Sequence, residues 1–194
     1  TTDIVAVISS TTGEIWMDRN LGASQVADSS SDANSYGDLY QWGRFADGHQ
    51  CRGSDTTSTL SSSTTVGNNL FIVNGGDPFN WLSTPDDNLW QGVSGVNNPC
   101  PGGYRIPTAA EWETERRSWG TEDSDGAFAS PLKLPVTGRR SNGSGDPFSV
   151  GSRGYYWSSS VSGSSARSLF FKSSDAYMLN SNRAWGYAVR CLKD

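Results

Sequence analysis

Few residues of this 194-residue chain are of the types that carry catalytic chemistry. It holds three cysteines, Cys51, Cys100 and Cys191, and a single histidine, His49. One histidine cannot build a Ser–His–Asp triad or a site with two histidine ligands. No two cysteines lie within four positions of each other, as a cysteine-rich zinc site requires. We therefore expect no enzyme, and we expect His49 to be a loop residue bonded to the backbone.

The paired carboxylates give no stronger indication of catalysis or metal binding. Asp86-Asp87 and Glu122-Asp123 are typical of solvated loop charges, and a glycosidase needs two carboxylates that flank a cleft. The stretch 123–126 has the composition of a calcium loop, but Leu134 stands where the bidentate glutamate of such a loop would be. We expect no cofactor, with a structural calcium ion as the open alternative.

The odd number of cysteines favours one disulfide and one leftover thiol if the compartment is oxidising. Cys100 begins the turn 101–103, and Cys191 ends an apolar segment at the C-terminus. A bridge between them would tie the last strand to the middle of the chain. We predict the pair Cys100–Cys191, and the alternative is three reduced thiols.

Charge and composition limit the class of protein. The formal charge is −5, so the chain lacks the basic face that a nucleic-acid binder needs. No stretch approaches the roughly 20 apolar residues that cross a bilayer. No signal peptide opens the chain, so its start resembles that of a mature protein or an excised domain. We expect one domain, no nucleic-acid partner and no direct membrane insertion.

Small polar and aromatic residues dominate the sequence, with 31 serines, 22 glycines and 22 aromatic residues. Serine and glycine favour turns and loops over long helices. Together with tyrosine and tryptophan, they are also the residues that binding loops use. The composition therefore predicts a loop-rich fold on a compact frame.

Hydrophobic patterning predicts the elements that must position any site in the first half of the chain. Residues 3–8 read as a buried strand and residues 14–18 as a second strand. An apolar stripe in residues 36–45 favours a short helix. Residues 47–98 read as a long loop insertion, pinned to the core by the apolar pieces 70–73 and 79–82.

The second half of the chain begins with a clear helix-start motif. Thr108 and Glu111 form a capping box that starts a helix over residues 107–119, and Glu113 and Arg117 form a favourable pair one turn apart. Strands are predicted after it at residues 132–137, 155–160, 167–172 and 186–192. The proline in the first of these favours an edge strand or a bulge. The order predicts an α+β fold with two helices against a small twisted antiparallel sheet.

Five motifs in order resemble one family. They are Trp16–Gly22, Tyr36–Arg44, Cys100–Thr108 with Glu111-Trp112, Tyr156–Ser159, and Gly186–Cys191. The sequence from about residue 14 to the C-terminus is similar to the FISUMP or "major paralogous domain" family of bacterial surface proteins.

That family is similar in fold to C-type lectins and to the formylglycine-generating enzyme. The resemblance implies a single C-type-lectin-like domain over residues 1–194, in which the N- and C-terminal strands pair and the later strands carry a ligand surface. It also implies an extracellular or cell-surface protein. Domains of this kind serve as the variable proteins of diversity-generating retroelements, in which C-terminal strands and loops are diversified.

The resemblance places a ligand-binding, variable region at residues 150–194. The outward positions expected there are Ser162, Ser164, Ser165, Ser168, Phe170, Lys172, Ser174, Asp175, Tyr177, Asn180, Asn182 and Trp185. Phe170 supports the assignment, because an aromatic among small polar residues is typical of a binding hot spot. The alternative is that Phe170 is covered by the 174–184 loop. Trp185 is ambiguous, since alternation places it with Tyr187 on the core face.

Three functions remain. The first is non-catalytic ligand binding, as an adhesin or receptor-recognition domain of a bacterial surface, pilus-tip or phage protein, with a protein or glycan ligand on a host or neighbouring cell. The second is an accessory or structural domain with no ligand of its own. The third is an oxidase of the formylglycine-generating type. Enzymes of that type hold copper with two closely placed cysteines, whereas the cysteines here are far apart in sequence.

Overall fold

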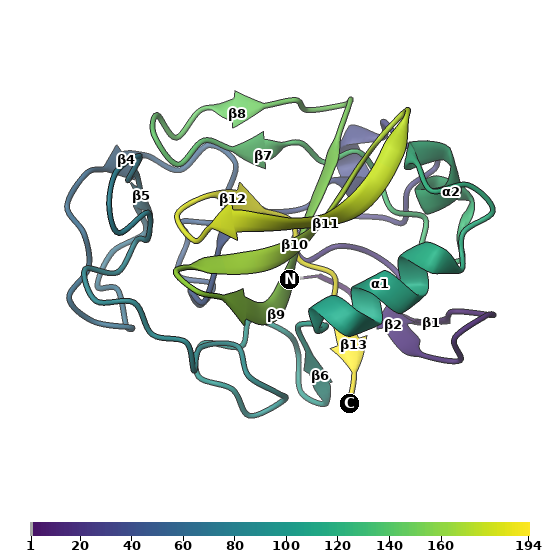
Figure 1. The fold of residues 1–194 in the computed structure, drawn as a ribbon, viewed down its shortest axis with the longest axis horizontal. Coiled ribbons are helices and arrows are strands. Elements are labelled where there is room, and N and C mark those ends of the chain that lie inside the picture. Colours follow the sequence, from purple (N-terminus) through teal and green to yellow (C-terminus); the bar gives the residue numbers. More distant parts are fainter. Residues whose placement is uncertain (1) are drawn as a thin grey trace.

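The computed structural model describes residues 2–194, and it has the expected α+β class with mostly antiparallel strands, two short α-helices and many loops (Figure 1). The elements are β1 (Ala6–Ile8), β2 (Ile15–Met17), the 3-10 helix η1 (Ala33–Ser35), β3 (Tyr40–Gln41), β4 (Thr56–Thr57), β5 (Phe71–Ile72), β6 (Tyr104–Arg105), α1 (Ala109–Arg117), α2 (Ser124–Ala129), β7 (Arg139–Arg140), β8 (Pro147–Phe148), β9 (Gly154–Ser162), β10 (Ser165–Lys172), β11 (Asp175–Asn182), β12 (Gly186–Tyr187) and β13 (Leu192–Lys193).

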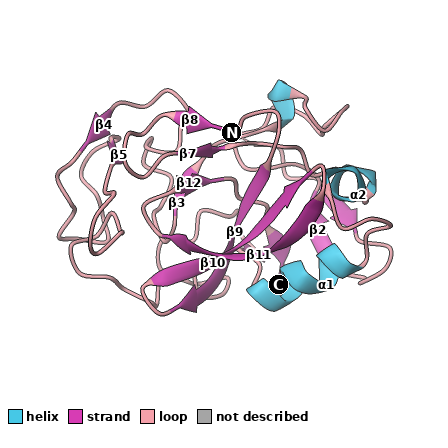
Figure 2. Ribbon diagram, turned by 45° about the horizontal axis from the view of Figure 1, so that its top comes forward, coloured by secondary structure: helices cyan, strands magenta, loops and turns pink. Residues whose placement is uncertain are grey.

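The longest strands form a three-stranded antiparallel sheet in the order β11-β10-β9. Helices α1 and α2 pack on one face of it (Figure 2), where Leu169 and Phe171 join Trp112 of α1 in a buried cluster. The opposite face carries Tyr155, Trp157 and Phe170 in a second buried cluster. Both faces of this sheet are therefore covered over most of their length, which decides how its residues can serve a site.

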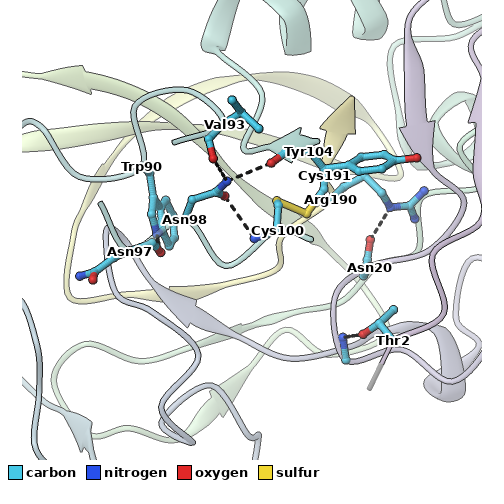
Figure 3. The surroundings of a disulfide bond; sticks show 11 residues. Thr2, Asn20, Trp90, Val93, Asn97, Asn98, Cys100, Tyr104, Arg190 and Cys191 are labelled. Carbon is cyan, nitrogen blue, oxygen red and sulfur yellow. Dashed lines mark hydrogen bonds between the residues drawn. A yellow bond between two sulfur atoms is a disulfide. The ribbon is translucent and has the colours of Figure 1, made fainter. Parts of the chain in front are cut away.

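The two ends of the described chain meet in a second sheet, ordered β1-β2-β13-β6. Leu192 of β13 pairs with Trp16 of β2 and with Arg105 of β6, all antiparallel. The predicted disulfide Cys100–Cys191 is confirmed and lies directly beside this sheet (Figure 3). Cys51 is free and exposed.

The loop before β6 is held in place by one side chain close to that bridge. The Asn98 amide donates to the carbonyls of Val93 and Tyr104, at 3.1 and 2.9 Å, and accepts from the Cys100 backbone N–H at 3.1 Å (Figure 3). The chain therefore enters β6 with the sulfur of Cys100 already directed at Cys191.

The predicted capping box starts α1 as expected. Thr108 is the N-cap, its side chain accepts from the Glu111 N–H, and the Glu111 carboxylate accepts from the Thr108 N–H. The Glu113–Arg117 ion pair is present as well. The helix ends at Arg117, two residues before the predicted limit.

The second helix is not where the sequence placed it. Residues 36–45 do not form a helix, because Gly37 and Gly43 take positive φ values of 68° and 80°, and Tyr40–Gln41 pairs with β12 as strand β3. The second α-helix is α2, whose N-terminus is capped by the Asp123 carboxylate. Asp123 thus accepts from backbone N–H groups of its own helix.

Two strand predictions and one loop prediction also need correction. The strand in residues 3–8 is short and lies at a sheet edge, with Ile4 58% and Ile8 61% exposed rather than buried. Residues 132–137 place Leu132, Leu134 and Val136 in the core without forming a strand. The 174–184 segment, expected as a loop, contains the eight-residue strand β11.

The long segment 47–98 is mostly irregular, apart from the short parallel pair β4–β5. Its apolar pieces are anchors as predicted: Phe71 and Trp81 are fully buried, and the Trp81 indole N–H donates to the Trp42 carbonyl at 2.7 Å. Across residues 2–194, no helix has the length and apolar character that a membrane crossing needs.

Candidate ligand-binding surface

A row of aromatic side chains crosses the sheet on the face turned away from the helices. Tyr177 of β11 lies opposite Phe170 of β10, which lies opposite Tyr155 of β9. The ring centroids are 5.0 Å apart for the first pair and 5.1 Å for the second. The row exists because these positions face each other across neighbouring antiparallel strands, where side chains are closest.

Arg139 of β7 continues the row beyond the sheet. Its guanidinium carbon lies 3.9 Å from the ring centroid of Trp185, 5.0 Å from that of Tyr155 and 5.4 Å from that of Phe148. Trp185 lies in the turn before β12, and Phe148 belongs to β8, the partner of β7. We call the six residues Tyr177, Phe170, Tyr155, Arg139, Trp185 and Phe148 the aromatic platform.

The platform is buried in its middle and open at its ends. Tyr177 is 45% and Phe148 55% exposed, whereas Phe170 is 4% exposed and Tyr155 is buried. Arg139 and Trp185 are half-buried between them. A partner would therefore touch the two outer rings, Trp185 and the guanidinium, while Phe170 and Tyr155 support them from below.

Two of the expected outward positions are wrong. Ser168 is fully buried, and Phe170 lies under its neighbours, in line with the alternative that the chain after residue 174 covers it. The cause is the unexpected strand β11, which pairs with all eight residues of β10. Ser168 remains satisfied inside the sheet, because its hydroxyl lies 2.9 Å from that of Ser181.

The expected residues in turns lie at opposite ends of the sheet. Ser162, Ser164 and Ser165 surround the β9–β10 turn, while Lys172, Ser174 and Asp175 surround the β10–β11 turn. A strand of eight residues separates these turns, a distance of roughly 26 Å at about 3.3 Å per residue. Lys172 and Asp175 also pair with each other at 3.2 Å. The two turns cannot contact one small ligand together.

Asn180 and Asn182 lie on the other face of β11 from Tyr177, since successive side chains of a strand alternate. The Asn180 side-chain oxygen accepts from Arg167 at 2.8 Å on that face. Of the twelve expected residues, the structure therefore brings Tyr177, Phe170 and Trp185 into one surface. The ambiguity at Trp185 resolves to a half-buried ring stacked on both Arg139 and Tyr187.

Sequence reasoning missed Arg139, Phe148 and Tyr155. Phe148 carried a usable signal, because it is an aromatic in the Gly- and Ser-rich stretch 141–152, as Phe170 is among small polar residues. Arg139 carried none, since its role depends on contacts with Tyr155 of β9 and with Trp185, which lies far from it in sequence. Its pairing with Phe148 in the β7–β8 hairpin is local.

The phenol of Tyr187 lies beneath this surface. Burial raises the pKa of Tyr187 to about 12, opposed by the hydrogen bond to Ser181 and by the nearby charge of Arg139. The Tyr187 hydroxyl donates to the Ser181 hydroxyl at 3.2 Å, which in turn meets Ser168. The floor of the platform is thus a neutral, fully hydrogen-bonded group of hydroxyls.

The residues considered for catalysis have structural roles. The His49 ring is fully buried; its Nδ1 lies 2.7 Å from Asp47 and its Nε2 accepts from the Gln41 backbone N–H at 3.1 Å. Asp87 and Glu122 remain largely exposed and pair with Arg183 and Arg116. Within residues 2–194, no three His, Cys, Asp or Glu side chains gather in a way that could hold a metal ion.

Searches for similar proteins found no match to this chain among protein-family models, curated proteins or solved structures.

Proposed function

We propose that this chain is a non-catalytic ligand-binding domain with a C-type-lectin-like fold, of the FISUMP type. The pairing of β2 with β13 supports the fold, because the resemblance implies N- and C-terminal strands that lie side by side. The Cys100–Cys191 bridge joins two of the five motifs that carry the resemblance, and Trp157 of a third motif is fully buried beside them in the core.

The aromatic platform is the observation that carries the proposed activity. Tyrosine, tryptophan and arginine are the residues most enriched among binding hot spots, and rigid rings give contact area at low cost in conformational entropy. Here they pack in one continuous row across the sheet, buried in its middle and open at its two ends. Ligand binding at this surface needs no acid–base group.

We place the domain outside the cell, on a bacterial surface, a pilus tip or a phage. The Cys100–Cys191 disulfide supports an oxidising compartment, since thiols stay reduced in the cytosol. The role would be adhesion or receptor recognition of a protein or glycan. A neighbouring gene for a reverse transcriptase, beside a template repeat matching residues 150–194, would support diversification of this surface.

The double variant Tyr177→Ala/Phe148→Ala tests the proposal. Arrays of host and bacterial surface proteins and glycans give the ligand, and interferometry then gives its affinity. We expect the variant to lose about 100-fold or more in affinity, because both rings are exposed hot-spot residues. Its melting temperature should change little, since neither ring fills the core. Phe45→Ala, which removes an exposed aromatic elsewhere, is the matched control.

Other outcomes favour the other functions. If no array component binds and the domain associates only with other parts of its own surface protein, it is an accessory domain. Copper uptake with oxidation of a cysteine peptide would support the oxidase. That activity would first require reduction of the bond that joins Cys100 to Cys191.

A further inference from the structure

Arg139 is the cation at the centre of the aromatic platform. Its Nε has no hydrogen-bond acceptor, and no carboxylate in residues 2–194 lies within ion-pair distance of it. By contrast, Arg44 and Arg183 pair with Asp47 and Asp87, and Arg190 donates to two backbone carbonyls.

The surroundings of Arg139 favour a charged partner. Trp185, Tyr155 and Phe148 surround the guanidinium and exclude water from much of it. Stacking on ring faces leaves the edge of a guanidinium available for two parallel hydrogen bonds to a carboxylate. A cation that is desolvated on several sides and has no internal counter-ion gains most from an external one.

The shape of the surface indicates the kind of partner. Four hollows of about 390 to 550 Å³ lie elsewhere on the described part of the chain, and no platform residue lines any of them. Small molecules prefer concave sites, whereas protein partners use flatter surfaces with an apolar centre rich in Tyr, Trp and Arg and a polar rim. Phe148 and Val150, each about half exposed, add apolar area to such a centre.

We propose that the aromatic platform binds a protein partner through an acidic side chain that pairs with Arg139, while apolar residues beside it pack on Trp185, Tyr177 and Phe148. This inference rests on the proposed function and names its ligand class. The partner presents an aspartate or glutamate within an apolar surface, and the guanidinium fixes its orientation.

Selection from a random peptide display library on the full chain tests the inference. We expect the enriched peptides to carry an acidic residue beside aromatic or aliphatic ones. Arg139→Gln should weaken each peptide by about 10-fold or more, as should changing the acidic residue to its amide. Applied together, the two changes should cost little more than either alone, because they remove the same contact. Arg139→Lys should retain part of the affinity, since it keeps the charge.

Arg167→Gln is the matched control, because Arg167 of β10 lies on the face of the β11-β10-β9 sheet turned away from the platform and pairs with Asn180. It should change the affinity by less than about 2-fold. Near-ultraviolet circular dichroism of each variant shows whether the aromatic cluster is intact. Arg139→Lys preserves the test if Arg139→Gln disturbs that cluster.

The remaining outcomes separate the two proposals. Neutral peptides that depend on Tyr177 and Phe148 but not on Arg139 would overturn the acidic partner and keep the binding surface. Peptides that depend on none of the three would contradict the surface itself. Failure to enrich any peptide, or binding of acidic glycans at Arg139 instead, would overturn the protein partner.

Discussion

Ser168 shows at the scale of single residues how a hydroxyl is held inside a sheet that is covered on both faces. Its oxygen lies 2.9 Å from that of Ser181, and Ser181 also receives the hydroxyl of Tyr187 at 3.2 Å. A buried hydroxyl without such partners would cost about 1–3 kcal/mol. The network therefore allows serines to lie under the platform, and it fixes the Tyr187 ring on which Trp185 stacks.

His49 makes stability depend on pH. Burial lowers the pKa of His49 to about 4, although its hydrogen bond to Asp47 opposes the shift, while the charges of Arg44 and Arg140 add to it. Above about pH 6.5 the ring is neutral in both folded and unfolded chains, and its contribution is complete. Between about pH 6.5 and about pH 4, only the unfolded chain takes up the proton, so the free energy of unfolding falls, by roughly 3 kcal/mol at most.

Urea denaturation across that pH range measures the effect. His49→Gln removes the titrating group and keeps a polar side chain, so its unfolding free energy should vary less between about pH 6.5 and about pH 4. Burial raises the pKa of Glu111, but the hydrogen bonds from Arg105 and Thr108 lower it overall, and this effect is common to the variant and the native protein. An unchanged slope in the variant would mean that another group causes the dependence.

At the scale of elements, sequence motifs correctly predicted those features that depend on contacts between residues close together in sequence. The start of α1 followed from Thr108 and Glu111, whose hydrogen bonds lie within four residues. The helix predicted for residues 36–45 is wrong because a buried, irregular segment also carries a stripe of apolar residues, and Gly37 and Gly43 set the path of this one. The loop predicted where strand β11 lies is wrong because Ser, Asp and Asn favour loops, while pairing with β10 overrides that preference.

Thr108→Ala tests how much the capping box contributes. The Thr108 side chain accepts from the Glu111 N–H at 3.2 Å and donates to the Glu111 carboxylate at 2.9 Å, and both bonds are lost in the variant. We expect the free energy of unfolding to fall by about 1–2 kcal/mol in urea. Thr114→Ala, at an exposed position of the same helix, is the control and should change it by less than about 0.5 kcal/mol.

At the scale of the whole molecule, the structure separates the region that closes the fold from the region that we propose to bind. The bridge and the sheet β1-β2-β13-β6 join the ends of the described chain, while the platform draws on β7, β8, β9, β10, β11 and the turn before β12. The sequence indicated the pairing of the cysteines and two platform residues that a partner would touch, Tyr177 and Trp185. Arg139 could not be foreseen, because its neighbours come from segments far apart in sequence.

This separation predicts that the disulfide controls stability but not recognition. Cys100 and Cys191 are 91 positions apart. Replacing both by alanine should lower the free energy of unfolding by about 4–5 kcal/mol in the chain-entropy account, because the unfolded chain gains the freedom of that loop. Below its lowered melting temperature, the variant should bind a platform ligand as the native protein does, since no platform residue contacts either sulfur. Cys51→Ala is the control and should alter neither property, because Cys51 is exposed and free. Weakened binding by the folded bridge variant would show that the two regions are coupled, with the platform in the same cooperative unit as the bridge and the sheet β1-β2-β13-β6.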